Sequence, residues 1–317
     1  MSKVVQSGKS DRKSKSYIMI AGPTASGKSQ VAVSLAKALG GEIINADSMQ
    51  LYADLSVLTA RPSLSDRGGV PHHLYGVVDG AHRASVVKWL KLAADAMMLI
   101  RNRGKLPIVV GGTGMYLEAA INGIAPVPEV PAAIHDANTV LYQKIGGPAF
   151  WKQLAALDLP IAERITHGDS QRLIRAMSVI TATGTPLSAW QTRDHKGALI
   201  GQALKLTILP SRDILYRRIN ERFNKMLDDG AIDEVRCLAA RDLDPSLPLT
   251  KALGLSALKS VLEGKMTMSE AEYISKRDSR RYAKRQMTWL RNNYNAQITI
   301  KTKLSKSLME NIFSLIC

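Results

Sequence analysis

A glycine-rich loop at residues 22–29 holds the residue types whose spacing most directly implies chemistry. Its glycines let successive backbone N–H groups point at one anion, Lys28 adds a full positive charge, and the hydroxyl of Ser29 can hold Mg²⁺. An apolar run at 17–21 precedes the loop, and apolar residues recur at helical spacing after it. We therefore predict a phosphate-binding loop between a strand and a helix. The loop consists of Gly22, Pro23, Thr24, Ala25, Ser26, Gly27, Lys28 and Ser29.

The loop by itself does not specify a reaction. Kinases, nucleoside triphosphatases and enzymes whose leaving group is diphosphate all use such a cradle. Composition narrows the choice of partner: 43 Lys and Arg against 27 Asp and Glu give a formal net charge of +16. A balance this basic favours a polyanion larger than one nucleotide, and nucleic acid is the natural candidate.

Length and cysteine content bound the class of protein. The 317 residues are 45% apolar, enough for a full hydrophobic core in one large or two ordinary domains. Cys237 and Cys317 are far apart and outside any metal-binding spacing, which predicts a reducing compartment without disulfides or zinc. Residues 1–16 are basic and lack a signal-peptide or membrane segment, so we expect a disordered basic tail on a cytoplasmic enzyme that is not membrane-bound. An organelle-targeting segment is disfavoured because the tail has no amphipathic period.

Apolar runs alternate with helical patterns along the chain. Strands are predicted at 42–45, 106–110 and 204–209, and a helix at 89–100. This alternation predicts an α/β fold, a P-loop NTPase-like parallel sheet flanked by helices, with a helical C-terminal region.

Prolines at 126, 128 and 131 interrupt the alternation, and residues 134–192 show helical patterns without a clear strand. We therefore predict a helical insertion domain at 126–195 between two segments of the α/β core, 17–125 and 196–300.

Two polar residues follow predicted strands. Asp47 comes after the second strand and Thr113 after the strand at 106–110. Ligands in an open parallel sheet gather beyond the carboxyl ends of the strands, so both should face a crevice shared with the phosphate loop. Alone, Asp47 could bind Mg²⁺, cap a helix or take a proton.

The segment 277–291 is the densest basic stretch. As a helix it places Arg277, Arg281 and Lys284 on one face. We predict a basic surface for nucleic acid, and the alternative is a solvated charged face. Aromatic and amide side chains between the charges favour nucleic acid, and the opposite face should pack inward. The interleaved residues are Tyr282, Gln286 and Trp289, and the inward residues are Ala283, Met287 and Leu290.

Eight ordered blocks together resemble the tRNA dimethylallyltransferases, also called tRNA isopentenyltransferases. The match runs from about residue 17 to 295 and is far more specific than the phosphate loop alone. The blocks are GPTASGKS at 22–29, ADS and QLY at 46–48 and 50–52, TARPS at 59–63, PHHL at 71–74, GGT at 111–113, QRLIRA at 171–176, RI and RF at 218–219 and 222–223, and RYAKRQ and TW at 281–286 and 288–289.

The resemblance implies transfer of a dimethylallyl group from dimethylallyl diphosphate to the exocyclic amine of the adenine 3′ of a tRNA anticodon, with Mg²⁺ as cofactor. By this resemblance Asp47 is the general base, Thr113 lines the reaction channel, and Arg218 binds the diphosphate together with the phosphate loop. We expect a monomer whose insertion contacts the anticodon stem-loop. The residues expected to bind tRNA are Ser48, Met49, Gln50, Gln171, Arg172, Arg175, Arg277, Arg281, Lys284 and Arg285.

The sequence departs from the family pattern at three places. Residues 166–168 read Thr-His-Gly where His-Pro-Asn is usual, Ser178 replaces a common Glu, and residues 253–255 read Leu-Gly-Leu near the place where Gly-Tyr is usual. We expect these departures to affect RNA contacts rather than the transfer.

Three other functions compete with this interpretation. An adenylate isopentenyltransferase shares the phosphate loop but acts on free AMP, and generally lacks the helical insertion and the basic C-terminal block. A P-loop small-molecule kinase leaves the charge and the block at 282–289 unexplained. A non-catalytic RNA-binding ATPase would make Asp47 and Thr113 incidental.

Overall fold

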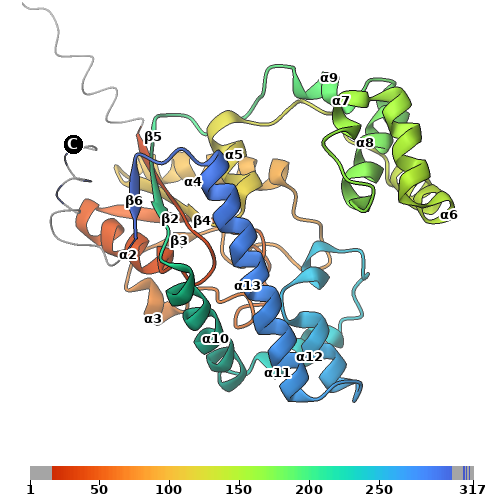
Figure 1. Ribbon diagram of the computed structural model, residues 1–317. Helices are drawn as coiled ribbons and strands as arrows, with labels where there is room; N and C mark the ends of the chain where they lie inside the picture. The colour runs from red at the N-terminus through yellow and green to blue at the C-terminus, as the bar shows by residue number, and fades with distance from the viewer. Residues whose placement is uncertain (1–15, 302–309, 311, 313, 315–317) are drawn as a thin grey trace, which may run out of the picture. The chain divides into compact units, whose positions relative to one another are not determined.

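The computed structural model describes residues 16–301, 310, 312 and 314 (Figure 1). The described residues divide into two compact units, one formed by those up to 121 and from 199 onward and the other by residues 122–198. All but the last residue of the predicted basic tail lie outside the described residues.

A six-stranded sheet forms the centre of the first unit. Its order is β3-β2-β4-β1-β5-β6, and all its pairings are parallel, which confirms the predicted α/β fold class. Each of the strands predicted at 42–45, 106–110 and 204–209 is found within one residue of its expected ends. The strands are β1 (Tyr17–Ala21), β2 (Gly41–Ala46), β3 (His72–His73), β4 (Leu106–Gly111), β5 (Ala203–Ile208) and β6 (Ile298–Ile300).

Helices flank this sheet, as the apolar periodicity predicted (Figure 1). The helix expected at 89–100 begins earlier, after Ser85, because the Ser85 side chain caps it by accepting a hydrogen bond from the N–H of Lys88. The helices of this unit are α2 (Lys28–Leu39), α3 (Leu64–Arg67), α4 (Val86–Asn102), α5 (Gly114–Asn122, which ends one residue into the second unit), α10 (Arg212–Asp228), α11 (Ala231–Ala239), the 3₁₀ helix η1 (Pro248–Lys251), α12 (Leu255–Leu262) and α13 (Met268–Asn293).

Two apolar clusters hold the site-bearing elements. The larger joins β-strand residues such as Ile18 and Ile108 to Leu35 of α2, and all three are fully buried. The smaller joins Leu215 and Ile219 of α10 to Ala283 and Met287 of α13. The long C-terminal helix therefore packs through the inward face that the sequence predicted.

The second unit is helical. Its helices are α6 (Ala132–Leu157, interrupted at Gly146), α7 (Leu159–Ala162), α8 (Ser170–Thr183) and α9 (Leu187–Gln191), around a core that includes Phe150 and Leu173. Its limits are wider than the predicted 126–195 because Ile124 and Lys196 exchange backbone hydrogen bonds of 3.0 and 2.9 Å across its two ends. No helix of the described chain is long and apolar enough to cross a membrane.

Gly111 at the end of β4 gives a test of the sheet. A Cβ atom there would lie 2.0 Å from the backbone oxygen of Ala46 on β2, so strands β2 and β4 would have to separate. We expect Gly111→Ala to lower the free energy of unfolding by about 3 kcal/mol, measured by urea denaturation. Gly168→Ala, which meets nothing within 4 Å, is the control. Equal stability of the two variants would contradict the close packing of β2 against β4 at Gly111.

Candidate active site

The phosphate loop joins β1 to α2 and curls as the glycine spacing predicted. Gly27 takes a positive φ of 93° and caps α2, whose first residue is Lys28. A Cβ atom on Gly22 would lie 2.6 Å from Oγ of Ser26 and 3.0 Å from the backbone oxygen of Ile208, so a larger residue does not fit. Ser29 lies in the first turn of α2, where N–H groups and the helix dipole favour an anion.

Gln286 of α13 ties this loop to the sheet. Its Oε1 accepts a hydrogen bond of 2.9 Å from the N–H of Thr24, and its Nε2 donates one of 2.9 Å to the backbone oxygen of Gly112. Trp289 also turns inward: a Cβ atom on Gly114 would be 2.6 Å from its ring. The interpretation that Gln286 favours an RNA-facing surface was wrong, because its side chain is buried and supports the loop, whereas Trp289 is half-buried.

Asp47 and Thr113 lie at one edge of the sheet with the loop, since β2, β4 and β1 are neighbours. The buried side chain of Asn45 shapes the turn: its Oδ1 accepts from the N–H of Asp47 at 2.8 Å, and its Nδ2 donates to the backbone oxygen of Asp47 at 2.9 Å. Asp47 itself accepts a hydrogen bond from the N–H of Met49 at 3.1 Å. Oγ1 of Thr113 accepts from the N–H of Ser48 at 3.0 Å.

Positive charge is concentrated beside the loop. Burial lowers the pKa of Lys28 to about 8; the attraction of Asp47 opposes this shift, and repulsion from Arg222 adds to it. Burial also lowers the pKa of Arg222, again against the attraction of Asp47. An anion in the loop would relieve the repulsion between the two cations.

Arg222 is the residue that sequence reasoning missed. It donates a hydrogen bond to Oγ1 of Thr24 and lines the same cavity as Asp47. Arg218, predicted for the diphosphate, lies one turn earlier on α10, is exposed, and donates to the backbone oxygen of Ser26 at 3.4 Å. The four-residue spacing of these two arginines was the available signal, because it places both on one helix face toward the loop.

A cavity of about 310 Å³ opens beside the loop and joins polar to apolar groups. Tyr282 lies on its wall and forms a hydrogen bond with Thr113, while burial raises its pKa above the ordinary range. The polar lining residues are Thr24, Asp47, Ser48, Thr59, Arg222, Lys251, Ser279, Tyr282 and Arg285, and the apolar ones are Met49, Leu58, Ile219, Phe223, Met226, Ala252 and Leu253.

The other residues predicted to bind tRNA have varied surroundings. Nε2 of Gln50 donates to the backbone oxygens of Thr59 and Ala60, at 2.9 Å each, so its amide supports a loop of the protein. On α13, Arg281 and Lys284 are exposed. Arg277 pairs with Asp278 at 2.9 Å, and Arg281 approaches the same carboxylate at 3.7 Å, which offsets part of the charge of this face.

In the second unit, the predicted residues lie on α8. Gln171, Arg172 and Arg175 are all exposed, and Arg172 pairs with Asp169 at 3.5 Å. Ser178, expected to affect RNA contacts, is instead fully buried, and its Oγ accepts a hydrogen bond from Asn138 at 3.3 Å. Leu255, expected to do so as well, is also buried, at the start of α12 of the first unit.

A phosphate loop that opens onto a partly apolar cavity, with a carboxylate at the adjoining strand edge, is the site of a P-loop transferase. The chain belongs to the IPP transferase family, whose sequence model matches residues 50–293. A second model, isopentenyl transferase, matches residues 15–71.

Named relatives cover nearly the whole chain. A tRNA dimethylallyltransferase of Parvibaculum lavamentivorans is 46% identical over 301 residues, 94% of this chain and 95% of the relative. The crystal structure of the tRNA isopentenylpyrophosphate transferase of Bacillus halodurans is similar with a TM-score of 0.68 and 33% identity, over 95% of this chain and 96% of that one. A eukaryotic dimethylallyltransferase acting on tRNA gives a TM-score of 0.73 and 28% identity, over 87% and 70%.

The contacts of Gln286 lead to a prediction for the loop. Gln286→Leu leaves the N–H of Thr24 and the backbone oxygen of Gly112 without these partners. We expect it to lower the free energy of unfolding by roughly 2 to 4 kcal/mol and to weaken diphosphate binding about tenfold, because the loop amides lose their fixed direction. Thermal unfolding and calorimetric titration with diphosphate measure the two effects. The control is Thr288→Ala, because Thr288 is exposed on the same helix. Unchanged diphosphate affinity in Gln286→Leu would refute the role of Gln286 in fixing the phosphate loop.

Proposed function

We propose that the protein transfers a dimethylallyl group from dimethylallyl diphosphate to the exocyclic amine of the adenosine 3′ of a tRNA anticodon and releases diphosphate. The observation that carries this proposal is the cavity in which the phosphate loop, the carboxylate of Asp47 and an apolar wall meet. Relatives named tRNA dimethylallyltransferase that match nearly the whole chain support it.

The loop stabilises the leaving group. As the allylic C–O bond breaks, negative charge builds on the diphosphate, and cations aimed at it lower the barrier. Lys28 and Arg222 lie at the loop with their charges only partly balanced by Asp47. Mg²⁺ suits phosphate and hydroxyl oxygens and keeps several waters, and the hydroxyl of Ser29 is a donor of this kind; the ion would add charge neutralisation at the leaving group.

The carboxylate of Asp47 takes the proton of the amine. An aromatic amine is a weak nucleophile, so a base within hydrogen-bond reach assists the attack. The contacts of Asp47 with Asn45 and Met49 fix the turn that presents its carboxylate to the cavity. Tyr282 lines the adjoining wall and is hydrogen-bonded to Thr113, which is not itself among the residues that line the cavity.

The apolar wall receives the five-carbon chain. Ile219, Phe223 and Met226 follow one another at helical spacing on α10 and are all buried. Arg222 lies on the same helix, so a diphosphate held by this arginine carries its prenyl chain along apolar side chains that exclude water.

The exposed basic residues of α13 hold the RNA. Arg285 lines the cavity and Lys284 is its exposed neighbour, so both can contact phosphates near the adenine that enters. The adenine must leave its stack, which costs a few kcal/mol that contacts with the flanking backbone can offset.

Labelled dimethylallyl diphosphate tests the proposal against its alternatives. The protein is incubated with unmodified tRNA and, separately, with AMP. We expect label in tRNA and none in AMP; label in AMP alone would indicate an adenylate isopentenyltransferase. Phosphoryl transfer from labelled ATP to a small acceptor without prenyl transfer would indicate a kinase.

Asp47 gives the test of the base. Asp47→Ala should lower single-turnover rates at saturating tRNA by a factor of about 10² to 10⁴, with a smaller change in tRNA affinity. Asp47→Asn keeps the shape but cannot accept the proton, and it should fall to a similar rate. A rate within a few-fold of the wild type in either variant would remove Asp47 from this role.

The basic helix gives a test of RNA binding. Changing Lys284 and Arg285 to Gln should reduce the slope of log affinity against log salt by about 1.4 to 1.8 units if each contacts one phosphate. All tRNA substrates should weaken about equally, because phosphate contacts do not read sequence. Arg277→Gln should change the slope less, since Asp278 already offsets the charge of Arg277. Filter binding over a salt series measures the slope. An unchanged slope in the double variant would show that this face of α13 is a solvated charged face that does not contact RNA phosphates.

A further inference from the structure

We propose that Glu234 of α11 is a positioning residue that fixes the apolar end of the cavity and thereby sets the preference for a five-carbon over a ten-carbon allylic diphosphate. The inference rests on the proposed function, because it concerns the prenyl chain that the cavity receives. Glu234 is not among the residues that line the cavity, so its influence passes through the loop that it holds.

The carboxylate of Glu234 is the centre of a turn at residues 55–59. One oxygen accepts hydrogen bonds from the N–H and hydroxyl of Ser56 and, at 2.9 Å, from the N–H of Val57. The other accepts from the N–H of Leu58 at 2.8 Å. Three successive backbone N–H groups thus converge on one side chain, an arrangement that fixes backbone direction more firmly than a single contact.

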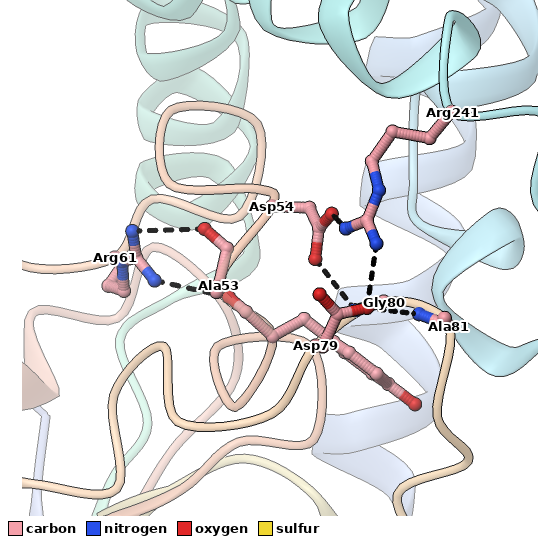
Figure 2. A network of polar contacts seen from close by, with 8 residues as sticks. Ala53, Asp54, Arg61, Asp79, Gly80, Ala81 and Arg241 are labelled. Carbon is pink, nitrogen blue, oxygen red and sulfur yellow. Dashed lines mark hydrogen bonds and ion pairs between the residues drawn. The ribbon is translucent and has the colours of Figure 1, made fainter.

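An ion-pair network attaches the same loop near the other end of α11. Figure 2 shows Arg241, just beyond this helix, between the carboxylates of Asp54 and Asp79. Asp54 also accepts a hydrogen bond of 2.8 Å from the N–H of Gly80. The segment at 54–58 is therefore held by α11 at Glu234 and by the turn after α11 at Arg241.

The held segment presents Leu58 to the apolar wall. Leu58 is buried and lines the cavity together with Phe223 of α10. A Cβ atom on Gly254 would lie 3.2 Å from Cδ1 of Leu58 and 3.3 Å from Cε2 of Phe223, so Gly254 packs closely on both side chains. Leu58 has little room to withdraw while its N–H is bound to Glu234, and this limits the depth available to a prenyl chain.

Loss of the negative charge of Glu234 would release this wall. Glutamine retains one acceptor oxygen, but its NH₂ group cannot accept from a backbone N–H, so at least one of the three amides loses its partner. The turn can then relax toward solvent and Leu58 can move away from Phe223. A longer chain gains room, whereas the phosphate loop and Asp47, which Glu234 does not contact, keep their geometry.

Competition between dimethylallyl diphosphate and geranyl diphosphate for one tRNA tests the proposal with the full-length protein. The quantity measured is the ratio of kcat/KM for the five-carbon to the ten-carbon substrate. We expect Glu234→Gln to lower this ratio about tenfold, in the range that shape discrimination in apolar pockets gives. Asp233→Asn is the matched control: Asp233 is the exposed neighbouring acid on α11 and pairs with Arg236, and it should leave the ratio unchanged.

A double variant separates positioning from general loosening of the protein. If Glu234 acts through Leu58, Glu234→Gln should change the ratio little in a Leu58→Ala background, whereas independent effects would multiply and overturn the proposal. A ratio within twofold of the wild type in folded Glu234→Gln would also overturn it. If Glu234→Gln does not fold, Arg241→Gln is measured in the same assay. We expect it to lower the ratio as well, and an unchanged ratio would overturn the proposal. A wild type that transfers no prenyl group would instead refute the proposed function.

Discussion

Excess positive charge beside the phosphate loop is the constraint on which the site depends. Lys28 belongs to the loop at the start of α2, Arg222 contacts the loop from α10, and Asp47 is the carboxylate whose attraction acts on both. Charges of one sign cost free energy when they are brought together away from water. The packing of the fold must therefore hold the two cations close together despite their repulsion. A diphosphate bound in the loop relieves this repulsion, and the relief adds to the binding free energy.

Long-range contacts provide this support. The order of the sheet places the ends of β2, β4 and β1 together, and Gly111 allows β4 to approach Ala46 closely. Gln286, 262 residues after Thr24 in the chain, fixes the loop from α13. The same helix packs on α10 and presents Lys284 and Arg285 outward, so one element supports the loop and displays basic groups for RNA. A substitution on the inner face of α13 should thus disturb diphosphate binding before RNA binding.

Sequence reasoning captured what depends on local pattern. Strands β1, β2, β4 and β5, the phosphate loop, the position of Asp47 after β2 and the inward face of α13 follow from periodicity and motif spacing, and the structure contains all of them, whereas the short edge strands β3 and β6 were not predicted. The contacts of Gln286 and Glu234 could not be predicted because each joins residues more than 170 positions apart in the chain. Arg222 was missed for a different reason: two arginines one turn apart could each reach the loop, and only the packing of α10 shows which one enters the cavity.

Calorimetric titration with diphosphate, in two buffers of different ionisation enthalpy at pH 8.5, tests the charge argument most directly. Lys28 has a pKa of about 8 in the free site, and a bound anion should raise it, so binding above pH 8 takes up a proton and weakens as pH rises. A parallel titration of Lys28→Met measures the protons that diphosphate itself gains or loses on binding, and these are subtracted from the value for the wild type. The wild type should take up more protons on binding than the variant does. Equal proton uptake by the two proteins would contradict the account.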